Sequence, residues 1–402
     1  MAHTGTTETP AAASNVRVCF TVSRPETERE RHAALDALRG VALLGVLLAN
    51  VDTEFRASPF ERFLPSMAPA TGPEAWAAEA LVLVCHTKPL LVFSFLFGFG
   101  LAAQEDRGSL ALARRLAFLF LIGVVHFVLL WSGDVLALYA VVAGFAAILL
   151  RLSRWGGLPA WSVVLVALAL FGVQALPIPY PRPFDTPEAM AAHVDAAHRI
   201  YGAGDYASIL RFRLETARPA LAALSWSVPR TLGLFLLGAS AWRYGLFKAP
   251  RVDARLPTFA LVALLLGAGA AWAAARSHAS GVTLAALTEC GELGLAAGLG
   301  AAVLWLADRS RVGKALGALA PIGRMTLTSY LVQSVLLGLI FYGYGGGLFG
   351  RVSHVQGACI ALGIFAVQAA FAAAWLTRFR LGPVEWLWRS VTDRERKAMR
   401  RS

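Results

Sequence analysis

Residues 116–150 read LAFLFLIGVVHFVLLWSGDVLALYAVVAGFAAILL, and the short polar connection WSGD divides this stretch into two apolar runs. The runs belong to apolar segments 112–131 and 134–150, which as helices are about long enough to cross a hydrocarbon layer roughly 30 Å thick. Helix is the expected structure, because a membrane barrel would show short segments of alternating polarity. The short connection makes the two helices antiparallel neighbours. The stretch therefore predicts a helical hairpin in a membrane.

The same apolar character extends over the whole chain. Its 402 residues are 57% hydrophobic and 15% charged, with a mean hydropathy of +0.59, whereas a soluble domain carries about a quarter charged residues. We therefore predict an all-α, polytopic transmembrane helical bundle with about ten spans. The predicted spans are 35–51, 80–103, 112–131, 134–150, 158–176, 226–246, 257–275, 283–307, 321–342 and 355–377.

Basic residues lie mainly between the apolar segments. The formal net charge is +12, but this distribution is typical of membrane topology and not of a nucleic-acid-binding face. The loops after the second, fourth, sixth and eighth spans and the C-terminal tail are rich in Lys and Arg. The positive-inside rule therefore predicts that both termini lie in the cytoplasm. No nucleic-acid partner is expected.

The polar segments divide the chain into five parts. The first 30 residues lack the apolar core of a secretory signal and are predicted to be a disordered cytoplasmic tail. Residues 177–225 are polar and are predicted to form a small, partly helical extracytoplasmic cap. The parts are the tail 1–30, a five-helix membrane region 31–176, the cap 177–225, a C-terminal membrane region 226–392 and a basic cytoplasmic tail 393–402.

The four cysteines are widely separated, so no metal site or disulfide framework is predicted.

His126 and Asp134 are ionisable residues near the outer ends of the two hairpin helices. An ionisable group within a span is costly and is by default a functional candidate. His126 is either a histidine hydrogen-bonded to a neighbouring helix or a general base, since imidazole exchanges protons near neutral pH. Asp134 is expected to cap the helix that follows it, and a carboxylate within reach of His126 would also fix the imidazole tautomer. Both are named as catalytic candidates, and whether they touch is left open.

Four positions near span ends are candidates for binding a substrate. Asp36 and Arg39 share a helical face at the inner end of the first span, where Arg39 either snorkels to the headgroups or binds an anionic ligand such as a phosphate. Asn50 marks the outer end of the same span and could hydrogen-bond across helices. Lys88 opens the apolar part of the second span, where it either snorkels outward or faces an outer cavity.

The segment GRMTLTSYLVQS, residues 323–334, is unusually polar for a membrane span. Arg324 lies at its inner end, and Gln333 lies deeper. A run this polar should face a cavity or other helices and not lipid. Arg324 and Gln333 therefore complete the set of substrate-binding candidates.

Six motifs occur in order along the chain and together resemble a known family. They are LDALRGVALLGVLLANV, KPLLVFSFLFGFG, GVVHFVLLWSGDVLALYA, LGLFLLGASAWRYGLF, IGRMTLTSYLVQSVLLGLIFYGYGGGLFG and RFRLGPVEWLWRSVT. The pattern resembles the YeiB family of bacterial inner-membrane proteins, whose C-terminal half is a domain of unknown function, and it covers residues 31–392. The resemblance implies a multi-pass protein of the bacterial cytoplasmic membrane.

The YeiB family is in turn distantly similar to membrane acyltransferases, including heparan-α-glucosaminide N-acetyltransferase and bacterial sugar O-acyltransferases. The shared feature is R-x-x-x-LD-x-x-RG at the start of the first helix, here Arg31, Leu35, Asp36, Arg39 and Gly40. This similarity implies transfer of an acyl group from cytoplasmic acyl-CoA to an acceptor across the membrane, with a histidine in the chemistry. His126 and His32 are the alternatives for that histidine.

The similarity leads to a first hypothesis for the function. Arginines near the inner side would hold the phosphates of acyl-CoA, a co-substrate and not a tightly bound cofactor. They are Arg39, Arg114, Arg115 and Arg324. His126 with Asp134 would activate the hydroxyl or amine of an envelope glycan or lipid, and Lys88 or Gln333 would stabilise the oxyanion.

Two alternatives come from other functional classes. The first is a transporter or flippase of a small amphiphilic solute, although the two halves of the chain show no clear internal repeat. The second is a non-catalytic membrane partner of an envelope complex, with 177–225 as the contact surface. The oligomeric state is left open.

Overall fold

The structure, a computed structural model, describes residues 26–64, 71–105, 108–152, 184–245, 255–277, 281–307, 309, 311–395 and 397–401. Within this part of the chain the ordered elements are helices, and there is one isolated antiparallel bridge between Phe379 and Arg400. The all-α prediction is therefore confirmed. The predicted span 158–176 lies outside the described residues, and so do residues 1–25 of the predicted tail. The first helix begins at Glu26, inside the predicted tail.

The helices fall into three groups along the chain. The first group is α1 (Glu26–Asn50), the π-helical turn η1 (Val51–Phe55), the 3-10 turn η2 (Glu61–Phe63), α2 (Pro73–Val84), α3 (Lys88–Ala102), α4 (Ser109–Leu129) and α5 (Leu136–Leu152). The second group is α7 (Pro187–Ala203), α8 (Tyr206–Glu215) and α9 (Ala217–Ser225). The third group is α10 (Val228–Arg243), α11 (Leu256–Arg276), α12 (Gly281–Ala307), α13 (Val312–Gly317), α14 (Ala320–Arg324), α15 (Thr326–Phe341), α16 (His354–Arg378) and α17 (Pro383–Asp393).

Capping residues explain where several of these helices begin. The Thr186 hydroxyl accepts a backbone hydrogen bond at the start of α7, and the Asp205 carboxylate does the same for α8. At the start of α16, Ser353 and Gln356 form a capping box, in which each side chain bonds the backbone of the other. These bonds satisfy N–H groups that the first helical turn leaves without partners.

Within the described residues, six apolar helical segments are long enough to cross a membrane. They are Ala33–Phe55, Pro73–Ala102, Ser109–Leu129, Leu256–Arg276, Gly281–Ala307 and His354–Arg378. The pair α9 and α10 passes the same test as a unit but is bent by 45°, which gives up to 7 candidate spans, while α5 and α15 are apolar but shorter. Each predicted span within the described residues coincides with one or two of these helices.

Large apolar side chains are exposed on the outer surfaces of several helices. Leu265 and Leu266 of α11 are 64% and 69% exposed, Leu121 of α4 is 62% exposed and Val367 of α16 is 70% exposed. Such surfaces are unfavourable in water but fit the acyl chains of lipids. Together with the helix lengths, they indicate a multi-pass protein embedded in a lipid bilayer.

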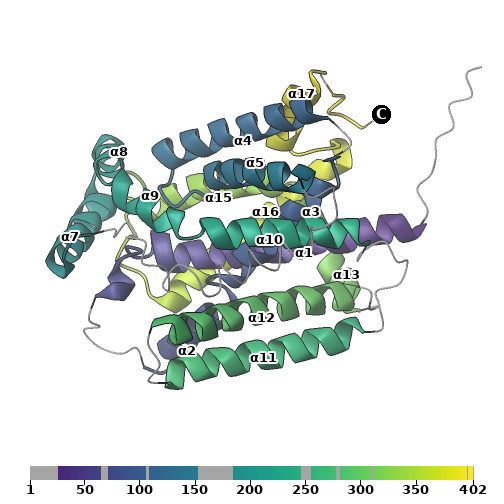
Figure 1. Ribbon diagram of the computed structural model, residues 1–402. Coiled ribbons are helices and arrows are strands. Elements are labelled where there is room, and N and C mark those ends of the chain that lie inside the picture. Colours follow the sequence, from purple (N-terminus) through teal and green to yellow (C-terminus); the bar gives the residue numbers. More distant parts are fainter. Residues whose placement is uncertain are drawn as a thin grey trace, which may run out of the picture.

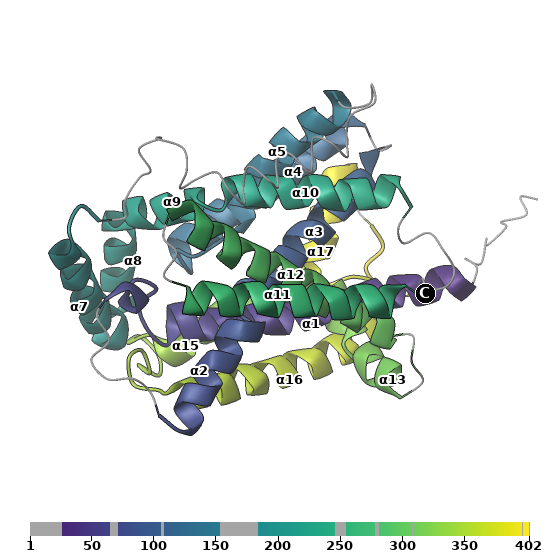
Figure 2. The ribbon, with the colours of Figure 1, turned by 60° about the horizontal axis from the view of Figure 1, so that its bottom comes forward.

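Most of the long helices run side by side along one direction (Figure 1). At one end of this bundle lie α7 and α8, while the beginning of α1, α13 and the C-terminal end of the chain lie toward the opposite end. The same separation is visible in Figure 2, after a turn of 60°. We call α7, α8 and α9 the cap, and we call the two ends of the bundle the cap end and the terminal end.

Glycines allow several helix pairs to approach closely. A Cβ atom at Gly98 of α3 would overlap the backbone of Phe235 in α10, and one at Gly238 of α10 would overlap the backbone of Phe95. A Cβ atom at Gly323 of α14 would likewise overlap the backbone of α1. Small residues at such crossings are typical of helix packing in membranes, where close backbone contact replaces the hydrophobic effect.

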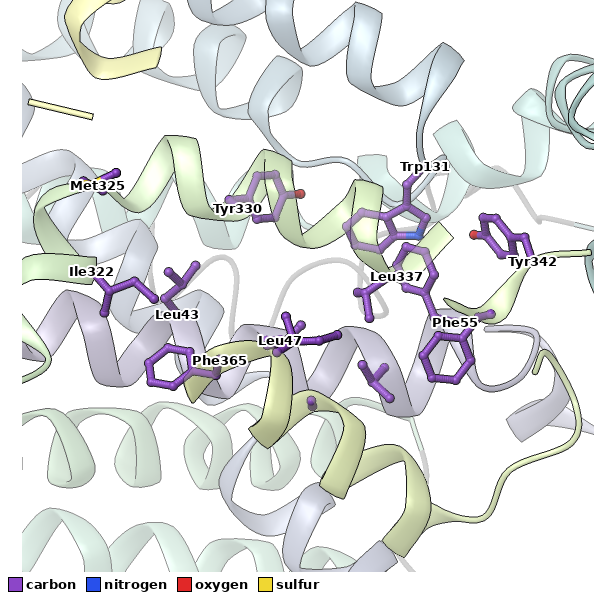
Figure 3. Close-up of a cluster of buried hydrophobic side chains, with 14 of the residues drawn as sticks. Leu43, Leu47, Phe55, Trp131, Ile322, Met325, Tyr330, Leu337, Tyr342 and Phe365 are labelled. Carbon is purple, nitrogen blue, oxygen red and sulfur yellow. The ribbon is translucent and has the colours of Figure 1, made fainter. Parts of the chain in front are cut away.

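The main buried cluster lies between α1, α15, α16 and the connection after α4. Figure 3 shows Leu43 and Leu47 of α1 on one side of this cluster and Tyr330 of α15 on the other. Trp131 and Phe55 lie at its cap end, with ring centroids 5.4 Å apart. The cluster therefore fixes Tyr330 and Trp131 beside the hairpin connection that contains Asp134.

Candidate functional site: a buried histidine–aspartate pair

The side chains of His126 and Asp134 are in direct contact. Nδ1 of His126 lies 2.9 Å from Oδ1 of Asp134, and each residue is 1% exposed. His126 is in the last turn of α4, and Asp134 lies in the connection before α5. The short connection WSG folds the acid back against the helix that precedes it. The structure therefore brings together the two residues predicted to be catalytic.

Asp134 also caps α5, as predicted. Its Oδ2 accepts hydrogen bonds from the backbone N–H groups of Leu136 at 2.9 Å and Ala137 at 3.3 Å. The Tyr330 hydroxyl of α15 donates to Oδ1 over 3.4 Å. Both carboxylate oxygens are thus engaged, so the side chain is held in one orientation by three separate parts of the chain.

The second ring nitrogen of His126 has a different environment. Nε2 is buried and has no hydrogen-bond partner among the described residues. A carboxylate can only accept, so its contact with a neutral imidazole favours the tautomer that carries the proton on Nδ1 and a lone pair on Nε2. The Tyr330 and Trp131 rings, with centroids 5.3 Å and 6.3 Å from the imidazole, pack against it. The arrangement matches the orientation of a general base by a carboxylate.

A glycine makes this contact possible. A Cβ atom at Gly123 would overlap the backbone at Ala137, so α4 and α5 could not approach as closely with a larger residue there. His126 follows Gly123 by three residues and therefore lies on the same helical face. The close approach brings Asp134 within bonding distance of the imidazole.

The pair lies at the cap end of α4. At the other end of this helix, Arg114 Nε donates to the carbonyl of Thr392 over 2.9 Å, beside the C-terminal segment. At the near end, the carbonyl of Leu129 accepts a hydrogen bond of 2.9 Å from the Tyr206 hydroxyl of α8. The pair is thus close to the cap, in agreement with the prediction that both residues lie near one end of their spans.

A second polar cluster contains residues that the sequence analysis did not select. Oδ2 of Asp52, in η1, lies 2.8 Å from Nε2 of His86, and Oδ1 lies 2.6 Å from Nδ1 of His354. Arg56 Nε donates to Oδ1 of Asp52 over 3.3 Å. The Asp52 side chain is 6% exposed, whereas its partners are 20–25% exposed. We call this set the Asp52 cluster.

Only part of the Asp52 cluster leaves a signal in the sequence. Asp52 and Arg56 are four residues apart, a spacing that predicts a pair on one helical face. The partners from α16 and the α2–α3 connection are separated from Asp52 by 302 and 34 positions, so no local pattern connects them. The π-helical turn, a geometry common at functional sites, also leaves no periodic signal.

Lys88 is buried and forms an ion pair with Glu292, whose side chain is 19% exposed. The whole Lys88 residue is 3% exposed, and its Nζ donates to Oε1 of Glu292 in α12 over 2.9 Å and to the carbonyl of Val82 over 2.8 Å. The other carboxylate oxygen of Glu292 is buried without a partner among the described residues. Lys88 is therefore directed into the bundle. It does not snorkel outward, which was one of the two alternatives that the sequence offered.

Gln333 and Asn50 have different environments. Gln333 Nε2 donates to Oε1 of Gln368 over 2.9 Å, which links α15 to α16, while Gln333 Oε1 is buried without a partner among the described residues. This agrees with the prediction that the polar face of 323–334 meets other helices or a cavity. Asn50 is the last residue of α1 and is half-buried.

The four arginines expected near the terminal end each have their own internal partner. Arg39 donates to Asp36 over 2.8 Å, and Arg324 donates to the carbonyl of Arg380 over 3.1 Å. Arg115 bonds Gln104 and lies over the Trp388 ring, 4.5 Å from its centroid. Arg114 bonds Thr392, so each of the four arginines has a different partner. These contacts join α1, α4 and α14 to nearby segments of the chain.

These observations define the class of protein. It is an all-helical, multi-pass membrane protein with a buried histidine–aspartate pair near one end of the bundle.

Comparison with known proteins identifies the family. Residues 241–395 match the family described as "Protein of unknown function (DUF418)". The chain is 31% identical over 401 residues to the uncharacterized protein YxaH of Bacillus subtilis (strain 168), covering 92% of this chain and 96% of that protein. It is also 31% identical over 392 residues to the uncharacterized protein YeiB of Escherichia coli (strain K12), covering 91% and 97%. The chain therefore belongs to the DUF418 family, and the resemblance to YeiB is confirmed.

Proposed function

We propose that this protein is a transmembrane acyltransferase, which moves an acyl group from acyl-CoA to a hydroxyl or amine of an envelope glycan or lipid. One observation carries the proposal: Nε2 of His126 is buried without a partner among the described residues, while Nδ1 is held by Asp134. An imidazole in this state is prepared to take a proton from an acceptor group.

In the proposed reaction, Nε2 of His126 accepts the proton of the acceptor hydroxyl or amine while the acceptor attacks the thioester carbon. A bond from the acceptor to the acyl carbon forms, and the carbon–sulfur bond then breaks. The proton returns from the imidazolium to the leaving thiolate, so that an ester or amide and free CoA are the products. Asp134 stabilises the imidazolium and keeps the ring in position.

The proposed topology has ten spans and both termini in the cytoplasm of a bacterium, in its inner membrane. The ten comprise the six long segments, the bent pair, the helices α5 and α15, and the predicted span 158–176. The location of the N-terminal end of α1 and the C-terminal end of the chain on one side, opposite the cap, supports this orientation (Figure 1). Arg39, Arg114, Arg115 and Arg324 would then meet the phosphates of acyl-CoA on the cytoplasmic side.

The test is acyl transfer by the purified protein in proteoliposomes. Radiolabelled acetyl-CoA is supplied on one side and an extract of envelope glycans and lipids on the other, and labelled products are counted. We expect labelling with the unmodified protein and a loss of about 10²–10⁴-fold in His126→Ala, the range of a general base. His198→Ala serves as the control, because His198 is a cap histidine bonded to Glu61. Full activity of His126→Ala would refute the proposal.

A proton-coupled carrier of a small amphiphilic solute is the second candidate, and the Asp52 cluster favours it. Asp52 bridges two histidines at the cap end of α1, and ionisable groups in membrane helices often belong to proton pathways. Solute flux in proteoliposomes without acyl-CoA distinguishes this function. Flux that depends on a pH gradient and is lost in Asp52→Asn would favour the carrier over the acyltransferase.

A further inference from the structure

Arg213 of α8 is a buried arginine with an incomplete set of hydrogen bonds. The residue is 2% exposed, and its Nη1 donates to the carbonyl of Leu129 over 3.0 Å. Its Nε and Nη2 atoms are buried and have no partner among the described residues. A buried arginine is normally paired or fully hydrogen-bonded, because the loss of hydration of its charge is costly.

The groups that interact with the Arg213 guanidinium are phenols and not carboxylates. The guanidinium carbon lies 5.8 Å from the ring centroid of Tyr201 and 5.2 Å from that of Tyr342, within range of a cation–π contact. Burial raises the pKa of Tyr201, against the opposite effect of the guanidinium. The Tyr201 phenol is therefore neutral, and within the described ranges the hydrogen bond of Arg213 goes to a carbonyl and not to a carboxylate.

The two unpartnered atoms have a particular geometry. Nε and Nη2 form one edge of the planar guanidinium group, and their N–H bonds point outward in parallel. This edge matches two oxygens of a carboxylate or phosphate, which it binds in a bidentate manner. Nη1, on the other side of the group, already anchors Arg213 to α4. The orientation of the fork is thus fixed before a ligand arrives.

We propose that Arg213, together with Tyr201 and Tyr342, binds an oxyanion, a phosphate or carboxylate group on a ligand that enters beneath the cap. Nε and Nη2 of Arg213 donate to two oxygens of this group. Tyr344 extends the phenol surface next to Tyr342, with ring centroids 5.9 Å apart.

This site is connected to the histidine–aspartate pair through α4. Leu129, whose carbonyl anchors Arg213, follows His126 by three residues. A row of aromatic rings also links the two places, with successive centroids 5.4, 5.4 and 6.3 Å apart. The rings are Tyr342, Phe55, Trp131 and His126. The ligand is accordingly the acceptor of acyl transfer, and only this identification rests on the proposed function.

The experiment measures binding to the full chain in dodecyl maltoside micelles, which contain no phosphate. The probes are inorganic phosphate, glucose 1-phosphate and glucuronate, with chloride at the same ionic strength as the blank. Phosphatidylglycerol, compared with diacylglycerol, tests a lipid source of the phosphate. The readout is the rise in the thermal midpoint, which reports a ligand that binds the folded state. Native mass spectrometry of the purified protein detects a ligand that is already bound.

We expect at least one oxyanion to bind the unmodified protein and to bind Arg213→Gln at least tenfold more weakly. Arg211→Gln is the matched control, because Arg211 is an exposed arginine on the same helix. Arg213→Lys keeps the charge but loses the fork, so weaker binding in this folded variant supports the site even if Arg213→Gln does not fold. A response to phosphatidylglycerol or to glucose 1-phosphate alone identifies a lipid or a soluble sugar phosphate as the source.

Two results would overturn the proposal. The first is an unmodified protein that neither carries nor binds any of these oxyanions. The second is equal binding by the Arg213 variants and the unmodified protein, which would mean that Arg213 only anchors the cap. The same titration with His126→Ala separates the two proposals, because intact oxyanion binding without any acyl transfer leaves the site valid and removes the enzymatic function.

Discussion

Nδ1 of His126 and Oδ1 of Asp134 lie 2.9 Å apart in the interior of a membrane bundle, and the same carboxylate caps the next helix. Asp134 uses different oxygens for its two roles: Oδ2 accepts the backbone hydrogen bonds at the start of α5, and Oδ1 contacts the imidazole. The Asp134 side chain thus both caps α5 and orients the imidazole of His126 in α4. A role in folding and a role in orienting a base are therefore expected to be separable by mutation.

Asp134→Asn is predicted to separate these two roles. The asparagine oxygen can still cap α5, and the amide NH2 would then face Nδ1 and force the imidazole proton to Nε2. Acyl transfer should fall by about 10²–10⁴-fold with a small change in KM, because the base has the wrong tautomer. Steady-state kinetics of the reconstituted protein measure this effect, and circular dichroism checks the fold. Unchanged kcat in a folded Asp134→Asn protein would contradict the orienting role.

Gly123→Ala is predicted to separate α4 from α5 slightly. The new Cβ atom overlaps the backbone at Ala137, and overpacking of this kind costs about 1–3 kcal/mol. The free energy of unfolding in mixed micelles of detergent and SDS gives the measurement. Gly144→Ala on α5 is the matched control, since a Cβ atom there meets nothing within 4 Å. A control as destabilised as Gly123→Ala would show that the loss reflects any added methyl group.

The sequence predicts the hairpin around 116–150 well because its determinants are local. The lengths of the two apolar runs predict the two helices. Because the connection before Asp134 has only three residues, WSG, and the chain reverses there, Asp134 must lie close to the end of α4, where His126 is. The spans 226–246 and 321–342 are less simple in the structure. The first contains α10, which has 16 residues and passes the test for a span only together with α9, across a 45° bend. Met325, between α14 and α15, divides the second. Hydropathy averaged over a window does not detect such breaks.

The Asp52 cluster and the Arg213 site could not be predicted in this way. Asp52 has the sequence context of an ordinary residue at the end of a span, and its partner His354 is far away in the chain. Arg213 lies in a polar helix, where an arginine is normally exposed, yet it is 2% exposed. In both cases tertiary packing of the cap end, and not local periodicity, buries the charge. Residue type and spacing carry no information on such packing.

Asp52→Asn is predicted to weaken the contacts between η1, α16 and the α2–α3 connection. The amide can no longer accept from both histidines and Arg56, and loss of one partner of a buried charge network costs about 3–5 kcal/mol. Because the partners are 20–25% exposed, we expect a smaller loss of about 1–3 kcal/mol. Unfolding in SDS measures it. Asp36→Asn, which breaks a more exposed pair on α1, the helix directly before η1, should cost no more than about 0.5 kcal/mol.

The cap is predicted to lose stability below neutral pH because of His193. Its imidazole packs on the Phe212 ring, 5.2 Å between centroids, and burial lowers its pKa from 6.5. The unfolded state therefore binds more protons between the lowered pKa and about 6.5, so stability decreases as pH falls through this window. Hydrogen bonds from Ser208 lower the pKa of Asp205, whose contribution is lost only at more acidic pH. Thermal midpoints at several pH values should show the decrease, and His193→Gln should reduce it.

Lys88 and Glu292 are predicted to be coupled strongly, because the side chains are only 4% and 19% exposed and the 2.9 Å bond joins α3 to α12. Lys88→Met leaves an unpaired carboxylate in the bundle and should destabilise the protein by about 3–5 kcal/mol, as should Glu292→Gln with its unpaired ammonium. The double variant removes both charges, so its loss should be clearly smaller than the sum of the two single losses. Unfolding free energies of the four proteins in SDS give the coupling energy. Arg230 and Glu289, bonded at 2.9 Å but each 24% exposed, are the comparison pair. Additive losses for Lys88 and Glu292 would show that the ion pair contributes little.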